Sequence, residues 1–276
     1  MTLKNFGCLV IDNTRSKAYI QKLAANLYFP GKVIFAELGK EKKSHEYSGD
    51  PVAVAIDNAF RARKYFLYTN SPNAIIPIQG MVPEKYASFD PDKQVISTLE
   101  ENGIEYEVVK SVSLNGQEVI DAVKRSGMEY FLFCGGAILG KEILSQGAKF
   151  IHIHPGYLPD VRGSMAIEWS ILLYGKCAVT AFFMEEQIDR GDIICRKYFD
   201  PPELEHNSMP PLYSSHIRSE VLIEIMRNFM ETGSFLTVPQ DRKAGGFYYR
   251  MHPALHNIVF FECAGREKTR NTKSKH

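Results

Sequence analysis

Two histidines stand two residues apart in the segment 151–157, which reads Ile-His-Ile-His-Pro-Gly-Tyr. They close an apolar run and come just before a Pro-Gly turn signal. If the run is a strand, His152 and His154 point to the same face of a sheet, because side chains alternate along a strand. Imidazoles in such a place can bind a metal, move a proton, or serve only as hydrogen-bonded structural residues. The partners that the rest of the sequence supplies decide among these roles.

A metal site would need at least one ligand besides the two histidines. Asp189 and Asp192 are the candidates, and a His-x-His pair with such a carboxylate would suit iron, zinc or manganese. The remaining histidines are scattered through expected loops and the tail and form no second cluster. The sequence therefore favours a site without a metal.

Catalysis without a metal needs an imidazole that moves a proton and a carboxylate that sets its charge. Asp189 lies in the segment QIDRGD, between two expected strands of which the first follows the histidine loop. A nearby carboxylate raises the pKa of an imidazole by charge attraction. We therefore expect His154 to donate a proton to a developing oxyanion, with His152 offering a second N–H to the same oxygen.

The elements that must position these residues follow a regular alternation of strands and helices. Such alternation predicts a mostly parallel sheet flanked by helices, an α/β fold in which active sites gather at the carboxyl ends of strands. Gly135, Gly136 and the histidine segment are expected at that edge, although the glycines do not match a dinucleotide-binding fingerprint. The expected strands are 6–12, 32–38, 105–109, 128–136, 149–154, 178–186 and 191–199, with weaker candidates at 64–69 and 73–78. The expected helices are 15–31, 90–104, 115–127, 140–147 and 165–175.

The pattern changes after Asp200-Pro201-Pro202. A long helix is expected over 211–231, followed by short strands around GFYYRM and HNIVFFE. We interpret 1–200 as one domain and 201–276 as a helical and short-strand extension packed on it. The basic stretch from Arg266 to His276 is expected to be disordered.

The composition is that of an ordinary globular protein, with 276 residues, 45% hydrophobic residues and a net charge of +1. This charge balance argues against nucleic acid or an acidic membrane as a partner. The five cysteines form no C-x-x-C pair, and no apolar run approaches membrane-spanning length. We therefore expect a cytoplasmic protein that acts on a small molecule, and we consider a homodimer as its assembly.

One stretch carries a resemblance to a known family. Residues 152–194 contain His-Pro-x-x-Leu-Pro-x-x-Arg-Gly, then a helix with a tryptophan, then Val-Thr, then Asp-x-Gly. This combined pattern resembles the formyltransferases that use N10-formyltetrahydrofolate, including glycinamide ribonucleotide transformylase, methionyl-tRNA formyltransferase and the sugar N-formyltransferases. The resemblance covers roughly 90–200 well. It implies a Rossmann-like formyltransferase fold, a catalytic role for 1–200, and transfer of a formyl group to an amine.

The resemblance also implies a catalytic triad of asparagine, histidine and aspartate. His154 matches the histidine and Asp189 matches the aspartate, whereas the asparagine position falls on His152. An asparagine amide donates a hydrogen bond at any working pH, but a neutral imidazole donates only from the correct tautomer. The implied roles are His152 and His154 as oxyanion donors, with Asp189 as charge partner and proton relay.

The upstream segment CGGAILGKEIL resembles the folate loop of the same family. The resemblance implies that this loop borders the pterin of N10-formyltetrahydrofolate, the formyl donor. Its apolar side chains suit a flat ring whose edge bonds to backbone groups. The residues expected at this cofactor site are Gly136, Ala137, Ile138, Leu139 and Gly140.

The acceptor is expected to be a small amine, and a nucleotide-linked amino sugar is the leading candidate. Arg15, near the end of the first strand, could contact a phosphate, whereas Asp12-Asn13-Thr14 could equally be only a helix cap. Alternatives remain open: a formyltetrahydrofolate hydrolase, a metal-dependent enzyme, or a folate-binding protein whose catalysis is altered or lost because His152 replaces the asparagine.

Overall fold

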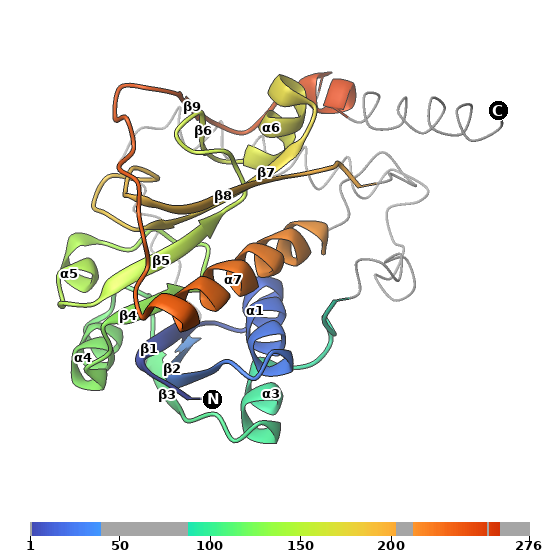
Figure 1. Ribbon diagram of the computed structural model, residues 1–276. Coiled ribbons are helices and arrows are strands. Elements are labelled where there is room, and N and C mark those ends of the chain that lie inside the picture. Colours follow the sequence, from blue (N-terminus) through green and yellow to red (C-terminus); the bar gives the residue numbers. More distant parts are fainter. Residues whose placement is uncertain (1, 40–87, 203–211, 253, 260–276) are drawn as a thin grey trace.

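A computed structural model describes residues 2–39, 88–202, 212–252 and 254–259. The expected strands at 64–69 and 73–78 and the basic tail lie outside these residues. Within them, seven strands form one sheet in the order β3-β2-β1-β4-β5-β7-β8 (Figure 1). Their bounds are β1 Thr2–Val10, β2 Phe29–Leu38, β3 Tyr106–Ser111, β4 Tyr130–Phe133, β5 Lys149–His154, β7 Cys177–Phe183 and β8 Ile193–Phe199.

The first five of these strands are parallel to one another, as the alternation of strands and helices predicts. β7 then pairs antiparallel with both β5 and β8. His154 lies opposite Thr180 in the β5–β7 register. The prediction of a mostly parallel α/β sheet is therefore confirmed, and the antiparallel hairpin brings the turn that carries Asp189 back beside the end of β5.

Helices cover both faces of the sheet (Figure 1). The central strand β4 is buried along its whole length, with Tyr130 and Leu132 in one core and Phe131 and Phe133 in the other. This division follows from the alternation of side chains in a strand covered on both faces. The core of Tyr130 packs on α1 Thr14–Ala25, α3 Val95–Glu101, α6 Ala166–Tyr174 and α7 Tyr213–Thr232, and the other packs on α4 Gln117–Ser126 and α5 Lys141–Leu144.

The turn from β1 into α1 is a helix cap. The Asn13 side chain accepts a hydrogen bond from the Ser16 backbone N–H at 2.8 Å, so it satisfies one of the free donors of the first turn. Asn13 also donates to the Cys134 carbonyl at 3.3 Å, which ties the start of α1 to the end of β4. Arg15, in the first turn of α1, is thereby held at the carboxyl edge of the sheet.

The chain after residue 200 packs on the first part and returns to the histidine loop. α7 buries its apolar side against the same core as α1, and β9 Gly246–Tyr248 pairs parallel with β6 Val161–Gly163. The short strand expected around 256–262 is wrong in its described part, because residues 254–259 are helical and the His256 N–H donates to the His252 carbonyl at 3.0 Å. A short apolar run fits either kind of element. The division at residue 200 stays a prediction.

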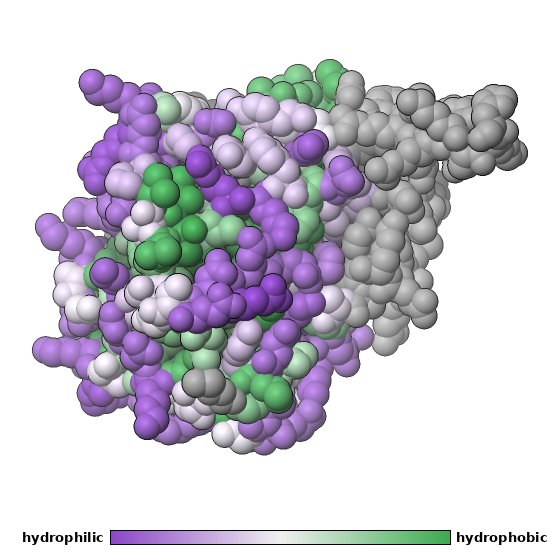
Figure 2. Space-filling model, in the orientation of Figure 1, coloured by the Kyte–Doolittle hydropathy of each residue, from purple (hydrophilic) through white to green (hydrophobic). Residues whose placement is uncertain are grey.

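The face that α7 crosses is mostly hydrophilic, and its apolar atoms lie in separate patches (Figure 2). Among the described residues, none of the helices combines the length and apolar character that crossing a bilayer requires.

Candidate active site

Both histidines of the opening motif line one cavity at the carboxyl end of β5. The cavity has a volume of about 450 Å³, and the loop after β4 and the β7–β8 turn also contribute to its wall. His152 and His154 share a face of β5, as their spacing predicts. Asp189 lines the same cavity, so the structure brings together the three side chains expected at the catalytic centre.

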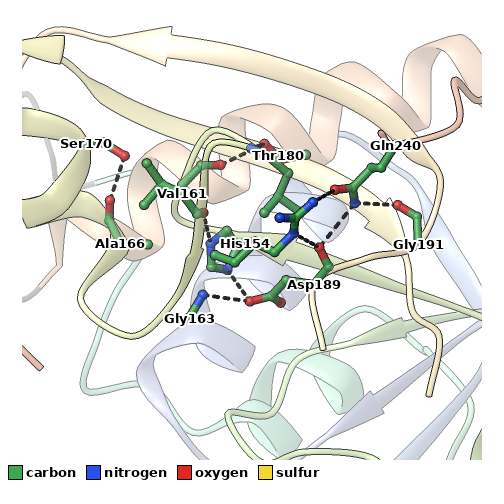
Figure 3. A network of polar contacts seen from close by, with 12 residues as sticks. His154, Val161, Gly163, Ala166, Ser170, Thr180, Asp189, Gly191 and Gln240 are labelled. Atoms are coloured by element: carbon green, nitrogen blue, oxygen red, sulfur yellow. Dashed lines mark hydrogen bonds and ion pairs between the residues drawn. The ribbon is translucent and has the colours of Figure 1, made fainter. Parts of the chain in front are cut away.

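His154 is held in one orientation by two contacts (Figure 3). Its side chain is buried, and Nε2 donates to the Val161 carbonyl at 3.0 Å. Its other nitrogen, Nδ1, lies 3.8 Å from Asp189 Oδ2. A carbonyl only accepts, so the proton of the neutral ring is on Nε2. Nδ1 is therefore the atom that can take up or release a proton.

Burial controls the protonation of His154. Burial lowers the pKa of His154 below its ordinary value, while Asp189 and the Val161 carbonyl act in the opposite direction without overcoming it. The charges of Arg218 and Arg15 lower the pKa of His154 further. The expectation of a raised pKa is wrong in its net direction, although the contribution of Asp189 has the expected sign. At neutral pH the resting ring is therefore a proton acceptor.

Asp189 occupies a tight turn between β7 and β8 with a left-handed backbone, φ 56°. Aspartate and asparagine tolerate this region better than other non-glycine residues. The Gly163 backbone N–H donates to Asp189 Oδ2 at 2.9 Å (Figure 3), so the carboxylate is held on the side of His154. The turn that positions Asp189 therefore depends on the loop after β5.

Arg162 and Gln240 fix the backbone of that turn. Both are buried, and Arg162 donates through Nε to the Asp189 carbonyl at 3.2 Å and through Nη1 to the Ala244 carbonyl at 2.7 Å. Gln240 donates to the carbonyls of Asp189 and Gly191 (Figure 3) and accepts from Arg162. Arg162 is the arginine of the His-Pro-x-x-Leu-Pro-x-x-Arg-Gly pattern, whereas no motif points to Gln240, which comes from the chain beyond α7.

Replacing Gln240 with leucine should lower both stability and turnover. The change removes the Gln240 hydrogen bonds to the Asp189 and Gly191 carbonyls and the one from Arg162. Arg162 still reaches the Asp189 and Asp241 carbonyls, so the main loss is the donor of the Gly191 carbonyl, at a cost of about 1–3 kcal/mol for a buried group left unsatisfied. We expect a lower melting temperature and a fall in kcat of about tenfold, because Asp189 loses its fixed backbone. Gln117→Leu, on the exposed face of α4, is the matched control. Unchanged kcat in a destabilised Gln240→Leu variant would assign Gln240 a purely structural role.

His152 lies between two aromatic rings, with Phe133 and Phe182 centroids each 5.9 Å from its own. Its side chain is partly exposed toward the cavity, yet Nδ1 is buried and has no hydrogen-bond partner in the described part of the chain. Burial lowers the pKa of His152 well below its ordinary value, and the neighbouring charges of Arg15, Arg218 and His154 act in the same direction. His152 is therefore neutral at pH 7.

The loop after β4 lies at the cavity as expected, with one difference. Gly136, Ala137, Ile138 and Leu139 line the cavity, and the first three are exposed. Gly140 does not line it: its N–H donates to Asn115 Oδ1 at 2.7 Å. Asn115 also donates to the Ile138 carbonyl at 3.0 Å. Gly140 therefore anchors the loop at the start of α5.

The Pro-Gly turn after His154 requires its glycine. A Cβ at Gly156 would lie 2.7 Å from both His154 Nε2 and the Val161 carbonyl oxygen. Glycine is the residue that allows such an approach. Gly156 therefore makes room for the hydrogen bond that orients the imidazole.

Two arginines complete the wall. Arg15 was considered as a phosphate contact from the sequence, and it lines the cavity. Arg218 also lines it but carries no signal in the sequence, because an arginine within an amphipathic helix is usually exposed.

Among the described residues, no three histidine, cysteine, aspartate or glutamate side chains converge as metal ligands.

Comparison with known sequences gives a consistent result. A family model described as formyl transferase matches residues 47–210. The methionyl-tRNA formyltransferase of Clostridioides difficile (strain 630) is 27% identical over 222 residues, which cover 72% of this chain and 69% of that protein. The enzyme of the same name from Ehrlichia canis (strain Jake) is 33% identical over 135 residues, 47% of this chain and 43% of that protein. The chain thus spans less than half of some relatives and about two thirds of another.

Solved structures share the fold. A sugar N-formyltransferase from Shewanella sp FDAARGOS_354 superposes with a TM-score of 0.51 at 14% identity, over 94% of this chain and 87% of that one. A 4-N formyltransferase from Francisella tularensis gives a TM-score of 0.51 at 12% identity, over 93% and 87%. At these identities the similarity describes architecture alone.

Proposed function

The chain belongs to the formyl transferase family, and from this we propose that it transfers the formyl group of N10-formyltetrahydrofolate to the amine of a small acceptor. The observation that carries the proposal is the His154–Asp189 pair, with Nδ1 and Oδ2 3.8 Å apart in the wall of the cavity. Proton transfer between an attacking amine and a departing nitrogen needs such a pair.

The residues around the cavity fit the proposed donor. Gly136, Ala137 and Ile138 form an exposed, largely apolar rim, which suits the face of a flat pterin ring. The rim lies beside the histidines, so a ring bound there would bring its substituent toward His154. The donor supplies the activated formyl group, and the protein supplies orientation and proton transfer.

The part proposed for His154 is that of proton acceptor. An amine that attacks a carbonyl carbon gains positive charge and must lose a proton. Nδ1 of the neutral ring can take this proton, because Nε2–H is already engaged with the Val161 carbonyl. Asp189 then stabilises the imidazolium across the 3.8 Å gap until Nδ1 gives the proton to the departing nitrogen of the donor as its bond to the formyl carbon breaks. The oxyanion contact falls to His152, since the neutral His154 ring has no second N–H to offer.

Replacing His152 with asparagine should keep or raise the rate of transfer. Asparagine restores an amide that donates at every working pH, in place of a neutral imidazole that donates only from one tautomer. We expect kcat of His152→Asn within about threefold of the wild type or above it, and a loss of about a hundredfold or more for His152→Ala. Steady-state assays of both variants check this. An inactive His152→Asn beside an active His152→Ala would assign the position a different role.

The acceptor that we propose is a nucleotide-linked amino sugar. The sequence relatives are methionyl-tRNA formyltransferases, so the test must include both kinds of amine. The protein would be incubated with N10-formyltetrahydrofolate and one amine at a time: an amino-sugar nucleotide, glycinamide ribonucleotide or charged initiator tRNA. Mass spectrometry of each amine would then detect an added formyl group. Formylation of an amino-sugar nucleotide supports the proposal. Formylation of the tRNA alone would show that the acceptor is the tRNA instead.

His152 also keeps a second function open. A site without the amide of asparagine could pass the formyl group to water, which would make the protein a formyltetrahydrofolate hydrolase. The ratio of formate to formylated amine separates the two functions. Formate released at the same rate with and without every amine favours the hydrolase.

A further inference from the structure

Arg218, on α7, is a buried cation that the proposed proton transfer does not use. Its side chain is 7% exposed and lines the cavity beside the histidines. Nη2 donates to Ser214 Oγ at 2.8 Å, whereas Nε is buried with no hydrogen-bond partner in the parts of the chain that the structure describes. The guanidinium is thus only partly satisfied.

A second arginine lies in the same wall. Arg15 donates to the Gly135 carbonyl and lines the cavity together with Arg218. Within the described residues, no carboxylate forms an ion pair with either guanidinium. As far as the described residues go, two like charges therefore share one cavity without a countercharge in contact.

This arrangement costs folding free energy, because a buried charge without a partner loses its hydration. Burial lowers the pKa of Arg218 to about 9, and the charge of Arg15 contributes in the same direction. The Tyr19 hydroxyl acts in the opposite direction on the pKa of Arg218 without overcoming burial, and burial raises the pKa of Tyr19 itself to about 12, so it carries no countercharge. Glu168 on α6 adds only a weaker attraction. An unfavourable charge kept in a cavity is typical of a ligand site.

We propose that Arg15 and Arg218 form a subsite for an anionic group, a carboxylate or a phosphate, carried by the amine acceptor. The identification of the acceptor as the carrier of the anion rests on the proposed formyl transfer. The anion site itself does not depend on that function. Guanidinium groups with unused donors are suited to either oxyanion.

The distribution of charge in the cavity favours the acceptor as the source of the anion. Asp189 is the carboxylate beside His154, so an ammonium group is attracted to that part of the cavity. Glu185 and Glu186 also line the cavity but are paired with Arg242 and Lys141. The two arginines attract the opposite charge, and both influence His152 and His154 electrostatically. A cavity of about 450 Å³ with these two charged parts suits an acceptor that carries an amine and an anion close together.

The test is anion binding to the full-length protein without donor or amine. Melting temperature would be measured with sodium phosphate and, separately, sodium acetate, each against sodium chloride of equal ionic strength. The variants are Arg15→Met, Arg218→Met and Arg218→Lys. The control is Arg125→Met, which removes one exposed arginine paired with Glu107.

We expect at least one of the two anions to raise the melting temperature of the wild type and of Arg125→Met by several degrees, and to have no effect on Arg15→Met or Arg218→Met. Arg218→Met alone should melt no lower than the wild type, because it removes an unpaired buried charge. Arg218→Lys should keep part of the shift. A shift of full size in Arg15→Met or Arg218→Met, or none in the wild type with either anion, would overturn the subsite. If Arg218→Met does not fold, Arg15→Met and Arg218→Lys decide the matter.

A second arm identifies the source of the anion. Saturating tetrahydrofolate should leave the phosphate or acetate shift in place, and Arg218→Met should bind tetrahydrofolate as the wild type does. Loss of the shift with tetrahydrofolate would assign the arginines to the carboxylates of the donor and overturn the acceptor assignment. These readouts need no turnover, so an absence of formyl transfer to any amine would contradict the proposed function and leave the anion result standing.

Discussion

Replacing His154 with alanine is expected to lower kcat/KM for formyl transfer about a thousandfold. The imidazole is the group placed to remove a proton from the attacking amine, and a positioned general base contributes about a hundred- to ten-thousandfold. The effect should fall mainly on kcat, because Nδ1 acts on the reacting nitrogen rather than on the remote parts of either substrate. Steady-state kinetics with varied amine and donor give the two constants.

A structural effect of the same substitution has to be separated from the catalytic one. Alanine leaves the Val161 carbonyl without its donor, at a cost of about 1–3 kcal/mol in stability. Tetrahydrofolate affinity and melting temperature of His154→Ala therefore need to be measured, with His252→Ala, an exposed histidine outside the cavity, as the control. A folded His154→Ala protein that transfers the formyl group within tenfold of the wild-type rate would remove His154 from the mechanism.

Replacing Asp189 with asparagine is expected to lower kcat about a hundredfold or more while the protein stays folded. Asparagine tolerates the left-handed backbone at this position, and its amide oxygen can still accept the Gly163 N–H. What is lost is the negative charge 3.8 Å from Nδ1, which stabilises the imidazolium formed during proton transfer. The substitution thus tests the charge with little change in shape.

The pH dependence of Asp189→Asn has a defined sign. Asp189 raises the pKa of His154 against the larger lowering by burial, so removing its charge lowers that pKa further. Activity requires the neutral ring and falls on the acid side as His154 becomes protonated. The acid limb of the kcat–pH profile should therefore lie at lower pH in Asp189→Asn than in the wild type. A limb that moves to higher pH would show that the Asp189 charge does not act on His154.

The strands and the pairing of His154 with Asp189 could be anticipated from the sequence for physical reasons. The apolar runs before Gly135 and Pro155 end at one edge of a parallel sheet, and the Asp-x-Gly segment follows the next strand. The resemblance of 152–194 to the family then matched two triad positions to His154 and Asp189. The sequence does not reveal that the antiparallel β7–β8 hairpin brings the carboxylate to Nδ1.

Gln240 and Arg218 could not be found in the same way. Both come from the chain after residue 200. The sequence around Arg218 has the pattern of an ordinary helix, and the sequence around Gln240 is irregular. Their importance lies in contacts across long sequence distances, such as the hydrogen bond from Gln240 to the Asp189 carbonyl. The direction in which the pKa of His154 shifts could not be predicted from the sequence either, because it depends on how deeply the ring is buried.

The most direct test of formyl transfer at the His154–Asp189 pair is a product balance by mass spectrometry. The wild type and the double variant His154→Ala/Asp189→Asn would be incubated with N10-formyltetrahydrofolate and the amine panel. We predict one formylated amine for each tetrahydrofolate released by the wild type, and none above background from the double variant. Formylated amine from the double variant at the wild-type rate would contradict this account, as would a wild type that binds tetrahydrofolate but formylates none of the amines.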